Sequence, residues 1–157
     1  MLNSDYSDQV CSMARSLEVV GERWTLLIVR EVFLGTCRFE EFVDNLGITR
    51  TVLTNRLDKL VEHGLLERHR YHQRPDRYEY RPTAKAGGLL PVLAHLMHWG
   101  DEHYPHPVGP PRRLLHHGCG GELEFSYRCP RCETTPAPHE VDAVLNPALR
   151  DIAGMQS

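Results

Sequence analysis

The sequence predicts an α+β fold that is mainly α-helical, with one β-hairpin and a small Cys/His unit near its C-terminal end. Three observations support this class. Apolar residues recur every three or four positions through most of residues 11–63, as in amphipathic helices. Residues 65–81 form two extended stretches around a turn that contains proline and aspartate. A proline-rich stretch at 104–111 then precedes most of the cysteines.

The first part of the chain predicts four helices, at 11–20, about 24–34, 38–46 and 50–63. The second is apolar nearly all round, which indicates a position inside a core or a subunit contact. The third and fourth are joined by the turn Asn45-Leu46-Gly47. A short helix, a glycine-containing turn and a longer helix form the helix-turn-helix arrangement.

The fourth predicted helix has two unlike faces. We expect Thr49 to cap its first turn through its hydroxyl and Gly64 to end it. One face is apolar, and the other is polar with no acid in its first turn. Side chains of the polar face can read base edges, since Arg fits guanine, Asn fits adenine and Thr fits a thymine methyl. The predicted base-reading residues are Arg50, Thr51, Thr54 and Asn55; an ordinary amphipathic surface helix is the alternative.

The hairpin is expected to form a wing beside this helix, with strands at 65–72 and 77–81. Residues 50–81 contain eight Arg or Lys and five Asp or Glu, so this segment is +3 in a chain of net charge -3. Such a local excess suits phosphates beside a groove, and the predicted contacts are Arg56, Arg74 and Arg77. Two alternatives remain: Arg56 pairs with a carboxylate inside the domain, or Arg77 faces its own hairpin.

A further helix is expected from Thr83, its N-cap, to about Trp99, with Pro91 bending or restarting it. Its apolar residues cover more than one side, which is more than one small domain can bury. We therefore predict that it pairs with the same helix of a second subunit. The predicted interface residues are Leu89, Leu93, Leu96 and Trp99.

The sequence predicts three segments: a DNA-binding and dimerisation domain at 1–103, a Pro-rich linker at 104–111, and a small Cys/His unit with a loose tail at 112–157. No apolar run approaches the roughly 20 residues that span a bilayer, and no signal-peptide pattern starts the chain. These features predict a cytoplasmic protein without a membrane partner. Five cysteines argue against a secreted disulfide framework.

The Cys/His unit has the ligand spacing of two zinc knuckles, with alternating apolar residues at 123, 125 and 127 between them as in a strand. Four protein ligands complete the tetrahedral coordination of zinc, so the zinc would be structural. A short segment with few large apolar residues needs such a metal ion to fold. The alternatives are a free or disulfide-forming dithiol, or a site with His117 or water as fourth ligand. The predicted ligands are His116, Cys119, Cys129 and Cys132.

Catalysis is not expected. The stretch Cys129-Pro130-Arg131-Cys132 resembles a thiol-disulfide motif, but no βαβ pattern surrounds it. A zinc deaminase needs a His-x-Glu ahead of Pro-Cys-x-x-Cys, and the chain has neither in order.

Five stretches resemble the HxlR-type family at family spacing: 21–25, 53–57, 64–68, 78–80 and 90–93. These are Gly-Glu-Arg-Trp-Thr, Leu-Thr-Asn-Arg-Leu, Gly-Leu-Leu-Glu-Arg, Tyr-Glu-Tyr and Leu-Pro-Val-Leu. The resemblance spans about residues 10–101 and implies a prokaryotic winged helix-turn-helix transcriptional regulator with a MarR-like fold. It also implies a homodimer on a palindromic operator. Pro82 and Ala86 depart from the family pattern, where leucine and glycine are usual.

Cys11 stands just before the first predicted helix, where the positive helix end favours a reactive thiolate. Some members of the resembled family are thought to sense oxidants or electrophiles with a cysteine at this place, so Cys11 is a candidate redox sensor. The alternative is a small residue packed near the dimer interface. Cys37 has no motif around it.

The sequence as a whole predicts a homodimeric, sequence-specific DNA-binding transcriptional regulator that responds to a thiol oxidant or a small-molecule effector. The alternative is a winged-helix protein–protein interaction module with the zinc ribbon as its docking element.

Overall fold

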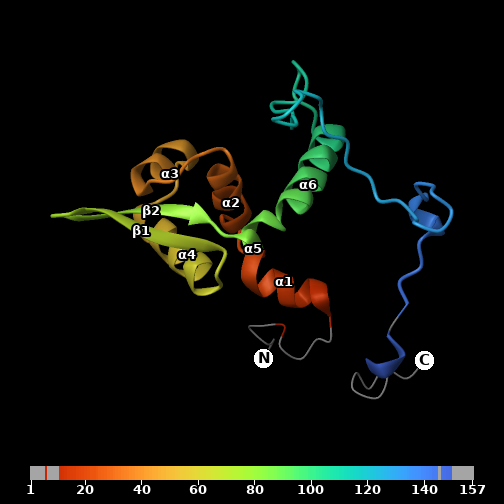
Figure 1. Cartoon of the computed structure of the whole chain (residues 1–157), viewed down its shortest axis with the longest axis horizontal. Helices are drawn as coiled ribbons and strands as arrows, with labels where there is room; N and C mark the ends of the chain where they lie inside the picture. Colours follow the sequence, from red (N-terminus) through yellow and green to blue (C-terminus); the bar gives the residue numbers. More distant parts are fainter. Residues whose placement is uncertain (1–5, 7–10, 145, 150–157) are drawn as a thin grey trace. The chain divides into compact units, whose positions relative to one another are not determined.

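The computed structural model describes residues 6, 11–144 and 146–149 (Figure 1). The chain divides into two compact units, 1–93 and 94–157, and the division falls within a helix. The first unit contains α1 (Ser12–Val20), α2 (Thr25–Phe33), α3 (Phe39–Leu46), α4 (Arg50–Glu62), β1 (Leu66–Gln73), β2 (Asp76–Pro82) and α5 (Ala84–Gly87). Helix α6 (Leu90–His103) crosses the division, and two short 3-10 turns follow at Pro138–Glu140 and Pro147–Leu149.

The four predicted helices and the hairpin are confirmed, and with them the α+β class. Gly47 adopts φ 61°, the left-handed conformation in which its N–H reaches the carbonyl of Val43 at 2.9 Å. This turn joins α3 to α4, as the helix-turn-helix requires. Strands β1 and β2 pair antiparallel, with an irregularity between Arg70 and His72. The hairpin they form projects beyond the helices (Figure 1).

One expectation about a helix end is wrong. Thr49 occupies the N-cap position of α4, but its hydroxyl makes no capping hydrogen bond to the first turn. The helix expected from Thr83 to about Trp99 is divided in two: α5 ends at Gly87 and α6 begins at Leu90, which agrees with the restart expected at Pro91. Gly87 and Gly88 also weaken the helix between α5 and α6. Pro91 sits in the first turn of α6, where a missing backbone N–H removes no intrahelical hydrogen bond.

The core of the first unit joins the helix-turn-helix to the wing. Phe42 of α3 is fully buried, and its ring meets that of Tyr80 on β2 edge-on, with centroids 6.5 Å apart and planes at 74°. Buried aromatic side chains contribute more to the free energy of folding than most other core side chains, because each removes a large apolar area from water. The other large side chains that are fully buried in the described part of the chain are Ile28, Val29, Leu53, Leu57, Leu60 and Leu66.

A buried carboxylate fixes α2 against α3. Glu31 is 5% exposed and accepts hydrogen bonds from Arg30 Nη2 at 2.8 Å, Asn45 Nδ2 at 3.0 Å and Thr36 Oγ1 at 3.2 Å. Burial alone would raise the pKa of Glu31, but these hydrogen bonds and the charge of Arg30 hold it below its ordinary value. The carboxylate therefore stays ionised and keeps the two helices in register.

The C-terminal end of α4 is held by the segment around α5. The Thr83 hydroxyl donates to the carbonyl of Gly64 at 2.8 Å, and the Thr83 N–H donates to that of Leu65 at 3.1 Å. The ammonium of Lys85 donates to the carbonyl of His63 at 2.6 Å. The Thr83 hydroxyl also caps α5, as expected, by accepting from Ala86 N–H at 3.3 Å.

The second unit has little regular structure after α6. The strand expected through Leu123, Phe125 and Tyr127 is wrong, since the described residues there form one isolated bridge, Leu115 to Glu122. Residues 124–128 find no backbone partner to extend that bridge into a ladder. None of the helices in the described part of the chain has the length and apolarity needed to cross a bilayer.

Candidate nucleic-acid interface

The polar face of α4 is exposed along its first two turns. Leu53 and Leu57 are fully buried on the opposite face, which fixes the rotation of the helix about its axis. The Thr54 hydroxyl donates to the carbonyl of Arg50 at 3.0 Å. All four predicted base-reading residues lie on the exposed face: Arg50, Thr51, Thr54 and Asn55.

Arg50 has a partner that the sequence did not indicate. Its Nη1 donates to Oε1 of Glu40 on α3 at 2.7 Å, and its Nη2 donates to the second oxygen, so the pair is bidentate. The guanidinium also lies 5.8 Å from the centre of the Phe39 ring. Hydrogen bonding from Arg50 lowers the pKa of Glu40, and the charge of Arg77 adds to this effect. Glu40 thus faces basic groups of both α4 and the wing.

Arg56 lies against its own domain. Its Nη2 is 2.8 Å from Oε2 of Glu22, and its side chain is only 19% exposed. Its Nε is buried and makes no hydrogen bond to any described residue. The structure therefore favours the alternative given above for Arg56, a carboxylate partner inside the domain, over a phosphate contact.

The eight basic residues between positions 50 and 81 fall into two groups, those with a described carboxylate nearby and those without one. Among the described residues, five of the eight basic side chains between 50 and 81 lie within 4.0 Å of a carboxylate: Arg50, Arg56, Arg68, Arg70 and Arg81. Within the same part of the chain, Lys59, Arg74 and Arg77 have no such partner. Two of these three are the predicted wing contacts.

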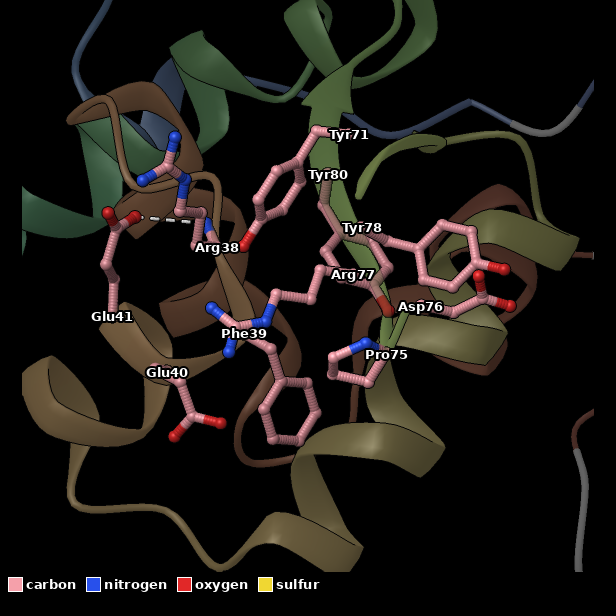
Figure 2. Close-up of a pocket in the computed structure, with 10 residues that line it drawn as sticks. All are labelled: Arg38, Phe39, Glu40, Glu41, Tyr71, Pro75, Asp76, Arg77, Tyr78 and Tyr80. Atoms are coloured by element: carbon pink, nitrogen blue, oxygen red, sulfur yellow. Dashed lines mark hydrogen bonds between the residues drawn. The ribbon is translucent and has the colours of Figure 1, made fainter. Parts of the chain in front are cut away.

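Arg77 reaches away from its hairpin. A hollow of about 740 Å³ separates α3 from the wing, and Arg77 extends across it toward Phe39 and Glu40 (Figure 2). Both acidic and basic side chains line the hollow. The dashed line in Figure 2 is the hydrogen bond from the backbone N–H of Arg38 to the carboxylate of Glu41, at 3.0 Å. The alternative in which Arg77 faces its own hairpin is not the arrangement seen.

Arg38 positions the wing, a role that the sequence did not reveal. Its Nη2 is 3.1 Å from Oε1 of Glu79 on β2, and its guanidinium lies 4.9 Å from the centre of the Tyr71 ring. The neighbouring Cys37 carbonyl accepts from Tyr80 N–H at 2.8 Å. Tyr71 stands at the irregularity of the hairpin, so the bulge supplies the ring on which Arg38 rests.

The four residues predicted for a dimer interface separate into two groups. Leu93 is 7% exposed and Leu89 is half-buried, and both pack on the core of their own chain. Leu96 and Trp99 are about half exposed, at 51% and 50%. With Val92 they follow three- and four-residue spacing and share one face of α6. The exposed apolar stripe of α6 is therefore Val92, Leu96 and Trp99.

Cys11 is exposed and stands at the N-cap position of α1, where its carbonyl accepts from Arg15 N–H at 3.1 Å. Cys37 differs. It is half-buried, and burial together with the charges of Glu79 and Glu41 raises the pKa of its thiol.

The predicted zinc ligands lie in two pairs. His116 Nδ1 is 3.2 Å from Cys119 Sγ, so the donor beside Cys119 is His116 and not His117. Cys132 hydrogen-bonds with Thr134, at 3.0 Å to its hydroxyl, and with Cys129, and these contacts lower the pKa of Cys132 to about 7. No three His, Cys, Asp or Glu side chains among the described residues lie close enough together to hold a metal ion.

An exposed polar helix face after a tight turn, flanked by a basic hairpin, defines a winged helix-turn-helix transcriptional regulator. Residues 19–107 match the family model described as HxlR-like helix-turn-helix, and the chain belongs to that family. An uncharacterized HTH-type transcriptional regulator of Mycobacterium tuberculosis, Rv3095, is 49% identical over 121 residues, which is 77% of each chain. YdeP of Bacillus subtilis, also an uncharacterized HTH-type transcriptional regulator, is 31% identical over 65% of this chain and 83% of its own.

Solved structures show the same likeness. PA1607, a proposed transcription factor, aligns with a TM-score of 0.76 at 31% identity, over 87% of this chain and 96% of its own. PA1374 from Pseudomonas aeruginosa aligns at 0.60 with 40% identity, over 88% and 94%. The redox regulator HypR in its reduced form aligns at 0.57 with 29% identity, over 60% and 94%.

Proposed function

We propose that this regulator acts as a homodimer that binds an operator sequence through α4 and the wing. The observation that carries the proposal is the exposed polar face of α4 beside two wing arginines, Arg74 and Arg77, that have no carboxylate within 4.0 Å among the described residues. Arg50, Thr51, Thr54 and Asn55 read base edges in the major groove. Arg74 and Arg77 contact phosphates, and Arg56 supports the domain through Glu22.

Dimerisation is proposed to use the exposed stripe of α6, Val92, Leu96 and Trp99, because exposed large apolar residues at helical spacing favour burial against a second copy. A two-fold axis would place two α4 helices about 34 Å apart, one turn of DNA. Sedimentation equilibrium of the full chain should then give twice the monomer mass of 18.0 kDa. A concentration-independent monomer would contradict this part of the proposal.

DNA recognition is separated from the alternative, a protein-docking module, by binding to the DNA upstream of the protein's own gene. Footprinting there should show a protected, two-fold repeated site whose affinity falls steeply with salt. Equal affinity for that DNA and for a scrambled duplex would favour the docking module. The relatives are named transcriptional regulators, and no catalytic role is proposed.

Base reading and phosphate contact predict different outcomes for two alanine variants. Asn55→Ala should change the preferred base at one position of each half-site, at a cost of about 1–3 kcal/mol on the original operator. Arg74→Ala should weaken binding to operator and random DNA alike and reduce the salt slope by about one unit. Fluorescence anisotropy titrations at several salt concentrations measure both.

The matched control for Arg74→Ala is Arg112→Ala, because Arg112 is also exposed but lies outside α4 and the wing. It should change neither affinity nor slope. The assigned roles are contradicted if Asn55→Ala behaves like Arg74→Ala, so that both variants lose the same fraction of affinity on operator and on random DNA.

A second proposal concerns the signal: the Cys11 thiol responds to oxidants. Two observations support it, the exposure of Cys11 at the start of α1 and the likeness to a protein named as a redox regulator. A small-molecule effector is the competing proposal for the signal.

Mild peroxide should therefore modify Cys11 before Cys37, whose thiol has a raised pKa and is half-buried. Peptide mass spectrometry after a short exposure measures the order. Cys11→Ser should abolish any effect of peroxide on operator binding, and Cys37→Ser should not. An unmodified Cys11 in a sample whose other cysteines are oxidised would end the sensor proposal.

A further inference from the structure

Two turns of the second unit have the same backbone geometry. In the first, His116 N–H donates to the carbonyl of Gly121 at 2.8 Å, and Gly120 N–H donates back to that of His116 at 2.7 Å. In the second, Cys129 N–H donates to the carbonyl of Thr134 at 2.9 Å, and Glu133 N–H donates back to that of Cys129 at 2.8 Å. The two turns therefore share one hydrogen-bond pattern, offset by thirteen positions in the sequence.

The match extends to backbone conformation and donor position. The fifth residue of each turn is left-handed, Gly120 at φ 71° and Glu133 at φ 60°. A non-glycine residue is uncommon in that conformation, so its presence in the second turn indicates that the geometry itself is required. In both turns the first and fourth residues carry the metal-binding atoms: His116 and Cys119 in one, Cys129 and Cys132 in the other.

The side chains of the first turn already stand at ligand spacing. Two atoms bound to one tetrahedral zinc, a nitrogen and a sulfur, lie about 3.5 Å apart at ordinary bond lengths. His116 Nδ1 and Cys119 Sγ are 3.2 Å apart. Glycines leave room beside both side chains, because a Cβ on Gly121 would stand 3.3 Å from Cys119 Sγ and one on Gly118 would stand 3.3 Å from Cε1 of the His116 ring.

The segment that carries the turns has no core of its own. Among the described residues from 104 to 148, no side chain is buried, and Leu115, Leu123 and Tyr127 are 51%, 40% and 52% exposed. Short chains bury only a small share of their surface, and those of about 40 residues or fewer usually need disulfides, a metal or oligomerisation to fold. Two turns that hold their shape without a core are consistent with a structural metal.

We propose that the two turns bind one zinc ion together, through His116, Cys119, Cys129 and Cys132. Three thiolates and one imidazole are a donor set that zinc favours in closed tetrahedral sites. Residues 124–128 make no backbone–backbone hydrogen bond to any described residue, so the segment between the turns can bring the two pairs together without breaking a ladder. This inference does not rest on DNA binding.

The test is the zinc content of the full chain, purified without chelator and measured by mass spectrometry for elements. We expect about one zinc per chain. Cys119→Ser and Cys129→Ser, one from each turn, should each reduce the content to near zero. Cys11→Ser and Cys37→Ser are the matched controls and should leave it unchanged.

The fourth ligand is tested by two histidine variants. His116→Ala should weaken zinc retention against a competing chelator at least tenfold, and His117→Ala should not; the reverse order would overturn the assignment of His116. Zinc absent from the wild-type chain, zinc retained in Cys119→Ser, or a Cys129–Cys132 disulfide in protein purified under reducing conditions would each overturn the site. Circular dichroism shows whether the helices of each variant remain folded, so metal loss is distinguished from general unfolding.

Discussion

Phe42→Ala is expected to lower the free energy of unfolding by about 3–5 kcal/mol, a large share of the stability of an ordinary domain. Phe42 is fully buried, and its ring contacts Tyr80, so its removal leaves a cavity between α3 and β2. Operator affinity should fall as well, because this contact holds the wing to the helix-turn-helix. Urea unfolding followed by circular dichroism measures the first effect, and anisotropy on operator DNA measures the second.

Phe39→Ala is the matched control, with the same chemical change in the same helix at a half-buried position. It should cost less than half as much stability, since large-to-small costs rise with the cavity left behind. Equal losses for the two variants would mean that Phe42 does not occupy the centre of the core.

Arg50→Ala is expected to reduce discrimination between operator and random DNA by about 1–3 kcal/mol, roughly a factor of five to a hundred and fifty. Arg50 begins α4, is exposed, and is held in a bidentate pair with Glu40. To read a base, it must exchange Glu40 for the guanine edge. The ratio of the two affinities, measured at one salt concentration, gives the effect.

Glu40→Gln tests the exchange. Loss of this carboxylate removes a negative charge near Arg50 and Arg77, so random DNA should bind more tightly and the salt slope should steepen. The double variant Glu40→Gln/Arg50→Ala should then show an effect on DNA affinity that differs from the sum of the two single effects, because the two side chains interact directly. Additive effects of the two substitutions would show that Glu40 does not restrain Arg50 in solution.

Much of this fold follows from local sequence signals. The period of apolar residues predicted α1 to α4, and Gly47 and Gly64 marked turns that do adopt positive φ. The alternative stated for Arg56, a carboxylate partner, also matched the structure. These features depend on residues close in sequence or on a single strong preference, such as that of glycine for left-handed backbone.

The features that could not be predicted depend on contacts between elements. Glu40 reaches Arg50 across a turn, and Arg38 reaches Glu79 across forty-one positions, so no spacing rule signals either pair. The bulge beside Tyr71 arises from strand pairing and not from one residue type. The break between α5 and α6 carried local signals: Pro91, at which a restart was expected, and Gly87-Gly88.

The hydrogen bonds from Thr83 and Lys85 to the carbonyls of Gly64 and His63, just after the last turn of α4, have a consequence for signalling. They couple α4 to α5. The coupling is at the C-terminal end of α4, opposite to the turns proposed to read bases. An event that rotates or shifts α5 must break these bonds or carry α4 with it. Because such coupling is reciprocal in free energy, operator DNA that bound α4 as proposed would also restrict α5. If α4 reads operator DNA as proposed, a change at α5 would reach it through the backbone, without any change to the side chains proposed to contact DNA.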